Sequence, residues 1–67
     1  MKTFYIYKNY ERGQALAICK NYLQAKQQAK ELAKQFKTII TVRDALGGLR
    51  LEINPTAPEQ HQTRETK

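Results

Sequence analysis

Four lysines in the stretch LQAKQQAKELAKQFK, residues 23–37, have the type and spacing needed to bind a polyanion. They lie four, four and three residues apart, so a helix places them on one stripe of its surface: Lys26, Lys30, Lys34 and Lys37. Glu31 is the only carboxylate in this stretch, so the lysines lack the usual Glu–Lys pairs of surface helices. The pattern favours contact with phosphates or an acidic protein surface, although a plain solvated face would have the same residues.

The positive charge of the chain is unevenly distributed. The net charge is +6, and the first 54 residues hold ten Lys/Arg against four Asp/Glu, whereas residues 55–67 hold two of each. The excess therefore lies in the part that we expect to fold, and it favours polyanionic partners. Simple solubility charge is the alternative. We expect Arg43 and Arg50 to extend the binding surface of the lysines.

Residues for catalysis are nearly absent. The chain has no serine and no tryptophan, one cysteine (Cys19) and one histidine (His61). A cysteine nucleophile would need a nearby base, and one Cys with one His cannot build a zinc site. We therefore predict no enzyme activity, no metal, no cofactor and no small-molecule substrate. A single cysteine and the lack of a long apolar run predict a cytoplasmic protein with no membrane contact.

Hydrophobic periodicity predicts four strands around one helix. Alternation of apolar and other residues marks the strands, and Asn21 is a good N-cap with Gln24 three residues later. The predicted strands are residues 3–8, 14–20, 38–44 and 49–53, and the predicted helix is 22–36. We expect an α+β fold, ββαββ, with a mostly antiparallel sheet in the order 2-1-3-4 and the helix on one face. Residues 1–54 form this single domain, and residues 55–67, with two prolines and no periodicity, form a disordered tail.

The strand pattern also predicts a core and an open sheet face. The expected core is Phe4, Ile6, Leu16, Ile18, Leu32, Phe36, Ile40, Val42, Leu49 and Leu51, with Ile53 also facing inward. Tyr5 and Tyr7 then lie on the open face beside Ala15 and Ala17, near Arg43 and Arg50. Such an arrangement could stack bases. The alternative is that the tyrosines only cover the back of the sheet or form a dimer contact.

The order of these pieces resembles the short type I-F anti-CRISPR proteins of phages and mobile elements. The resemblance covers about residues 1–53 and is carried by four segments: MKTFYIYK, ERG, YLQAKQQAKELAKQF and TVRDALGGLRLEI. One such family begins with Met-Lys and a Tyr-Ile strand, continues to a helix containing Gln-Ala-Lys, and closes with a hairpin. A widespread bacterial domain of unknown function with the same ββαββ order is a competing match.

The resemblance implies a non-enzymatic inhibitor in a bacterial host. It would bind a CRISPR RNA-guided effector complex where target DNA docks, and by position its contact residues are Lys26, Gln27, Lys30 and Lys34. The alternative is a nucleic-acid-binding accessory protein that uses the helix lysines and the open sheet face, with duplex DNA as a candidate partner. A structural dimer module is a third interpretation.

Overall fold

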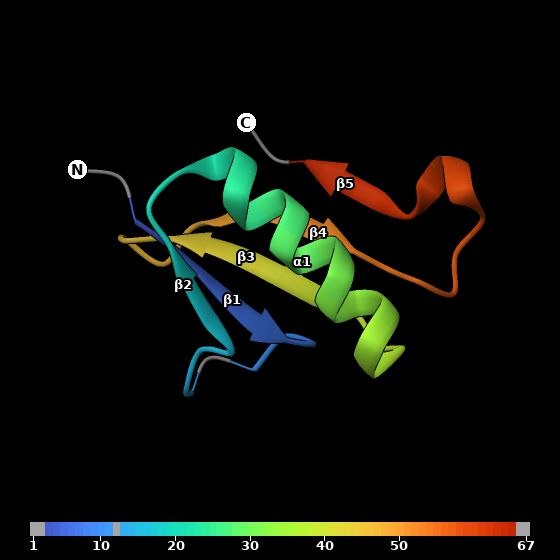
Figure 1. The fold of residues 1–67 in the computed structure, drawn as a ribbon, viewed down its shortest axis with the longest axis horizontal. Helices are drawn as coiled ribbons and strands as arrows, with labels where there is room; N and C mark the ends of the chain where they lie inside the picture. Colours follow the sequence, from blue (N-terminus) through green and yellow to red (C-terminus); the bar gives the residue numbers. More distant parts are fainter. Residues whose placement is uncertain (1–2, 12, 66–67) are drawn as a thin grey trace.

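In the described part of the chain, an α-helix packs across one face of an antiparallel sheet (Figure 1). The computed structural model describes residues 3–11 and 13–65. The strand order is β2-β1-β3-β4-β5, and every neighbouring pair is antiparallel. The elements are β1 (Phe4–Lys8), β2 (Ala17–Cys19), α1 (Tyr22–Phe36), β3 (Ile40–Asp44), β4 (Leu49–Ile53), the short 3-10 helix η1 (Glu59–His61) and β5 (Thr63–Glu65). The predicted α+β class, the helix and the order of the first four strands are confirmed, but the prediction of four strands was wrong.

The two ends of α1 are capped by local hydrogen bonds. The side chain of Asn21 accepts a hydrogen bond of 2.8 Å from the backbone N–H of Gln24, as predicted from the sequence. At the other end, Lys37 has a left-handed backbone with φ of 54°, and its N–H donates to the carbonyl of Ala33 at 2.8 Å. The helix therefore ends at Phe36, and Lys37 lies beyond its last turn.

The core fills the space between α1 and the inward rows of the three central strands. Ile6, Ile40, Val42 and Leu51 are completely buried, and burying each such side chain contributes about 1.5–3 kcal/mol. From the helix, the buried residues are Ala25, Ala29 and Ala33. These short side chains let the backbone of α1 approach the sheet closely. Ile53 faces inward, as predicted, and Leu32 packs at the margin of the core.

The predicted facing of β2 was wrong. Its pairing places Cys19 opposite Phe4 and Ala17 opposite Ile6, so the small residues face α1. Ile18 is instead opposite Tyr5 on the open face and is 62% exposed. Both rows of this strand contain apolar residues, and the close approach of the alanine-rich helix favours the smaller row beneath it. Leu16 and Phe36 also lie outside the buried core, at 40% and 41% exposure.

A bulge changes the register where β3 and β4 meet near their hairpin. Val42 is opposite Leu51, but the next residue, Arg43, is opposite Leu49. One extra residue, Arg50, is therefore accommodated on β4. The predicted core position of Leu49 was wrong because this shift moves it out of the inward row, and it is only half-buried.

The last strand comes from the segment that we expected to be a disordered tail. β5 pairs with β4 through Leu51–Glu65, Glu52–Arg64 and Ile53–Thr63. The connection is held at its start, where the side chain of Asn54 accepts hydrogen bonds from Thr56, and at its end, where the Gln62 carbonyl accepts from the Asn54 N–H at 2.7 Å. Backbone pairing at a sheet edge and polar contacts thus order a segment without apolar periodicity.

Candidate functional site

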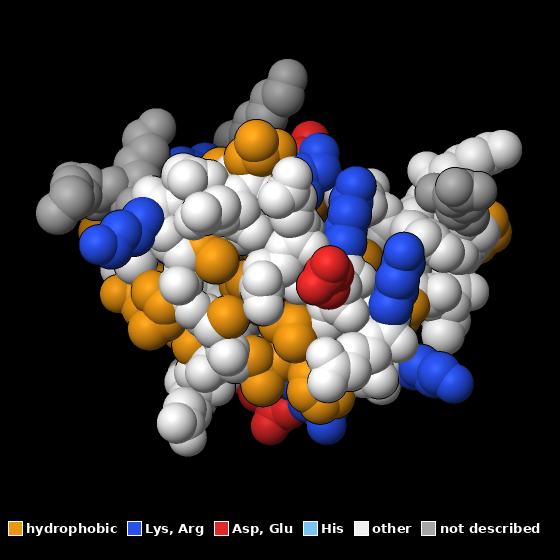
Figure 2. Space-filling model, viewed as in Figure 1, with side chains coloured by type: hydrophobic (Ala, Val, Ile, Leu, Met, Phe, Trp, Pro, Cys, Tyr) orange, Lys and Arg blue, Asp and Glu red, His pale blue; other side chains and the backbone are white. Residues whose placement is uncertain are grey.

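The lysine stripe lies along the side of α1 that faces β4 and β5. Figure 2 shows Lys and Arg side chains in a diagonal row over this side of the helix, and hydrophobic side chains along the other side, toward β2. Lys30, Lys34 and Lys37 are exposed, as is Gln27 beside them. Within residues 3–11 and 13–65, no carboxylate forms an ion pair with these three lysines. Three ammonium groups are therefore available to an external anion.

Lys26 differs from the rest of the stripe because Glu65 of β5 contacts it. Its Nζ lies 2.9 Å from Oε1 of Glu65, and the same oxygen accepts a hydrogen bond of 2.9 Å from the Tyr22 hydroxyl. The Lys26 ammonium and the Tyr22 hydroxyl hold the pKa of the Glu65 carboxyl below its usual range. Partial burial, together with the hydrogen bond to Glu65, raises the pKa of Tyr22 to about 12. Sequence patterns missed this cluster, since no local signal relates residue 65 to residues 22 and 26.

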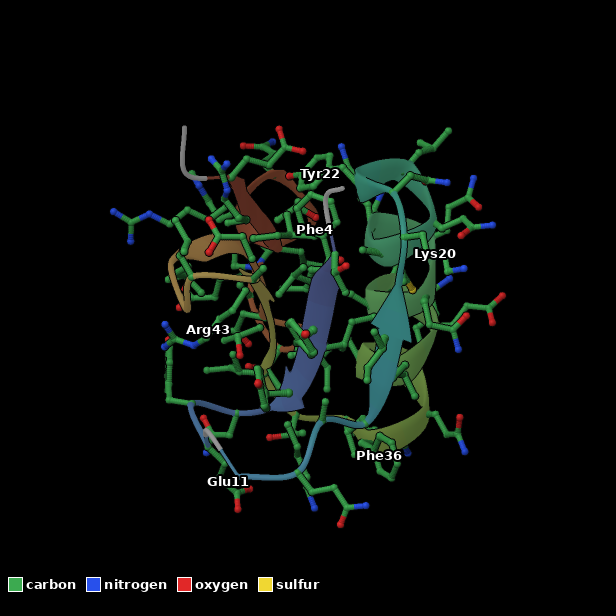
Figure 3. All side chains as sticks on the ribbon, turned by 90° about the vertical axis from the view of Figure 1, so that its left-hand side faces the viewer. Phe4, Glu11, Lys20, Tyr22, Phe36 and Arg43 are labelled. Atoms are coloured by element: carbon green, nitrogen blue, oxygen red, sulfur yellow. The ribbon has the colours of Figure 1, made fainter. Side chains whose placement is uncertain are left out.

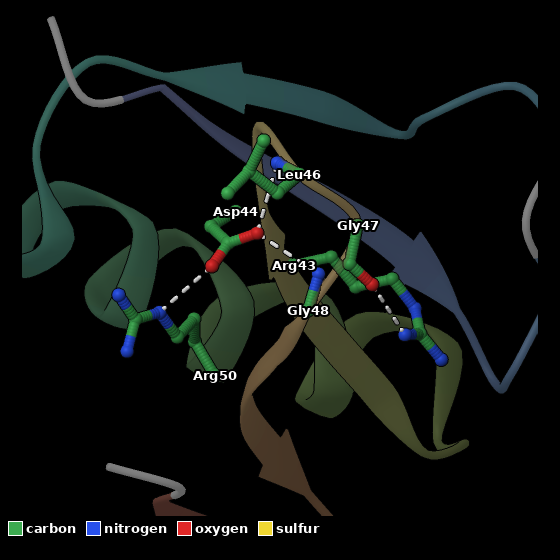
Figure 4. A network of polar contacts seen from close by, with 6 residues as sticks. All are labelled: Arg43, Asp44, Leu46, Gly47, Gly48 and Arg50. Atoms are coloured by element: carbon green, nitrogen blue, oxygen red, sulfur yellow. Dashed lines mark hydrogen bonds and ion pairs between the residues drawn. The ribbon is translucent and has the colours of Figure 1, made fainter.

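The two arginines predicted to extend the stripe are engaged at the β3–β4 hairpin (Figure 4). Nε of Arg50 lies 3.1 Å from Oδ2 of Asp44, and Arg43 donates a hydrogen bond of 2.9 Å to the Gly47 carbonyl. Oδ1 of Asp44 also accepts from the backbone N–H groups of Leu46 and Gly48. These backbone N–H donors, Gly48 first, and Arg50 lower the pKa of Asp44. The arginines thus organise the hairpin.

Arg43 lies on the opposite side of the sheet from the stripe. Figure 3 shows α1 on one side of the sheet and Arg43 on the other. Tyr5 is directly opposite Arg43, and Tyr7 opposite Thr41, so both tyrosines share this open face as predicted. Ile18 is their neighbour there instead of Ala17. The structure therefore divides the predicted site residues between two faces of the molecule.

The loop after β1 covers part of the open face. The Thr41 hydroxyl, completely buried, donates a hydrogen bond of 2.9 Å to the Asn9 carbonyl. Tyr10 extends to Glu52 and donates a hydrogen bond to its carboxylate, which raises the pKa of Tyr10. Both tyrosines predicted to stack bases are half-buried. The uncovered part of this face is therefore narrow, around Tyr5, Ile18 and Arg43.

No group of three or more His, Cys, Asp and Glu side chains able to hold a metal ion occurs in residues 3–11 and 13–65. Cys19 is half-buried beneath α1, and His61 lies in η1 and is exposed. Over the same residues, no helix is both long enough and apolar enough to cross a membrane.

Comparisons with known proteins do not assign a family. The chain matches no family model, no curated protein and no solved structure.

Proposed function

We propose that this chain is a small, non-enzymatic binding protein whose lysine stripe contacts an anionic partner. The observation that carries the proposal is the exposure of Lys30 and Lys34 along one side of α1, and of Lys37 just beyond its end, without ion-pair partners among the described carboxylates. Repulsion between lysines on one stripe slightly destabilises the free protein, and an anionic partner removes that repulsion. The uneven charge, +6 overall with none of the excess in residues 55–67, supports the same proposal.

The partner that we propose is an RNA-guided surveillance complex, met in the cytoplasm of a bacterial host. The support for this step is the resemblance of about residues 1–53 to short type I-F anti-CRISPR proteins. The chain would then act as an inhibitor that blocks or misdirects recognition of target DNA. A strongly basic chain does not imitate DNA, so its lysines would contact acidic protein surface or bound nucleic acid.

The second candidate function is direct binding of nucleic acid. It is favoured by the same three lysines, together with Tyr5 and Arg43 on adjacent strands of the open face. Lysine contacts to phosphates do not depend on base sequence. They weaken as the salt concentration rises, because the release of counterions from the nucleic acid on binding then becomes less favourable. The two functions therefore differ in whether free nucleic acid is sufficient for tight binding.

The experiment that tests the proposal compares three ligands. Wild type and the variant Lys30→Ala/Lys34→Ala are titrated with free duplex DNA, single-stranded DNA and a type I-F guide-RNA effector complex. The inhibitor proposal expects tight binding to the complex alone, reduced in the variant. Tight binding to free DNA, also reduced in the variant, would replace it with the second function. Equal binding of both proteins to every ligand would exclude the stripe as the contact surface.

A further inference from the structure

The edge of the sheet beside α1 contains a second feature that the lysine stripe does not explain. β5 is the outermost strand next to β4, and it is only three residues long. Thr63 and Glu65 face the helix side, opposite the buried Ile53 and Leu51, whereas Arg64 faces the other side with Glu52. The strand thus presents alternate side chains to two different surfaces, as a bound peptide does in strand addition.

Backbone pairing and a single carboxylate hold β5 at the edge of the sheet. Its backbone pairs with β4, and its one charged contact on the helix side is Glu65, at 2.9 Å from both Tyr22 Oη and Lys26 Nζ. None of its residues belongs to the hydrophobic core, since Thr63 is half-buried and Arg64 and Glu65 are exposed. Register comes from the backbone, and selectivity comes from one carboxylate.

We propose that the edge of β4, together with Tyr22 and Lys26, is a binding site for an extended segment of a partner protein that carries a carboxylate at the position of Glu65, and that β5 occupies this site in the free chain. The partner strand would pair with β4 and place a carboxylate between the Tyr22 hydroxyl and the Lys26 ammonium. This extends the proposed function by naming a protein contact. This inference can fail while polyanion binding by Lys30 and Lys34 stands, because its test measures the binding of a peptide at the edge of β4 and not the binding of a polyanion to the stripe.

Charge complementarity favours an occupant that carries a carboxylate at the position of Glu65. The Lys30 ammonium also acts electrostatically on the Glu65 carboxylate, and Arg50 acts on Tyr22, so positive charge surrounds this position. Release of β5 leaves Lys26 and Tyr22 without their carboxylate partner. An incoming strand that carries a carboxylate at this position restores the lost ion pair and hydrogen bond, whereas a strand without one does not.

The test uses the full chain and a labelled peptide of residues 58–67, PEQHQTRETK. The intramolecular β5 competes with this peptide at a high effective concentration, so wild type should bind it weakly. The variant Glu65→Ala weakens the internal competitor and leaves the site intact. It should bind the peptide about three- to tenfold more tightly than wild type. A peptide with Gln in place of the glutamate at position 65 should lose that gain.

Two controls tie the binding to this site. The double variant Glu65→Ala/Lys26→Ala should lose the gain, whereas Glu65→Ala/Lys20→Ala, which removes an exposed lysine outside the stripe, should keep it. Bound peptide should also speed hydrogen exchange at the protein's own Thr63–Glu65. The proposal would be overturned if the peptide failed to bind Glu65→Ala, or if the Gln peptide or a scrambled peptide bound this variant as tightly. Equal affinity of the two double variants for the peptide would also overturn it. Exchange of β5 between two copies would show as a dimer without added peptide, and would replace the partner protein by a second copy.

Discussion

The Tyr22 hydroxyl donates a hydrogen bond of 2.9 Å to the Glu65 carboxylate, and this joins the first turn of α1 to the last strand of the sheet across 43 positions of the chain. The same carboxylate also forms an ion pair with a lysine of the stripe. Glu65 engages Lys26, whereas Lys30 and Lys34 remain exposed. β5 thus forms one edge of the sheet and pairs with Lys26, which leaves the remaining lysines of the stripe for contact with a partner.

The first prediction concerns the titration of Tyr22. Its folded pKa of about 12 lies above the usual value of 10.0, so its contribution to stability is present below pH 10 and is lost as the pH rises toward 12. A phenolate absorbance titration of the four tyrosines should therefore show a late step, which Tyr22→Phe removes. Tyr10, whose pKa is also raised, should still titrate above the ordinary value in that variant. A single step near 10 for all tyrosines would contradict the contact.

The second prediction concerns β5 at acidic pH. The pKa of Glu65 is lowered from its usual 4.5, chiefly by Lys26, so its contribution is present above 4.5 and is lost as the pH falls through the lower folded value. The NMR shifts of the Thr63–Glu65 amides should change over that range. In Glu65→Gln, which cannot titrate, the change should be much smaller. Identical acid transitions in the two proteins would show that other carboxyls, such as Asp44, control this strand.

The third prediction separates the observed core from the one expected from the sequence. Leu51 is completely buried, so Leu51→Ala should lower the free energy of unfolding by about 2–5 kcal/mol. Phe36 is 41% exposed, and the Lys8 ammonium lies 5.6 Å from its ring centroid. Phe36→Ala should therefore lose less than the roughly 3–5 kcal/mol of a buried phenylalanine. Urea unfolding measures both, and a larger loss for Phe36→Ala would contradict this assignment.

Local sequence signals predicted where the helix and strands lie in the chain better than which side of each strand faces the core. The cap at Asn21, the helix 22–36 and the strand 49–53 follow from side-chain chemistry and periodicity within each segment, and all three are present. The facing of β2 could not be predicted in this way, because Ala17 and Cys19 on one row and Ile18 on the other are all apolar. The result depends on the close approach of α1, a tertiary effect.

In the candidate site, too, features that depend on local spacing could be predicted from the sequence, and features that depend on tertiary contacts could not. The stripe of Lys30 and Lys34 follows from helical spacing alone, since both lie in α1 about one turn apart, and both are exposed. The pairing of Lys26 with Glu65 could not be predicted, because β5 has no apolar alternation and its position depends on backbone pairing with β4. The bulge that accommodates Arg50 likewise depends on the register of two strands.

The central claim is that the lysine stripe, rather than the net charge, makes the contact with an anionic partner. Two variants test it, because each removes two exposed positive charges: Lys30→Ala/Lys34→Ala on the stripe, and Lys8→Ala/Lys20→Ala outside both the stripe and β5. The measurement is the affinity of each for the effector complex, and for duplex DNA, across a salt series. We predict a clear loss of affinity for the stripe variant and near-wild-type affinity for the control variant. Where nucleic acid is bound, the salt dependence of the stripe variant should be shallower by about one unit of slope per lost phosphate contact. Equal losses in the two variants would contradict the claim, because net charge alone would then explain the binding.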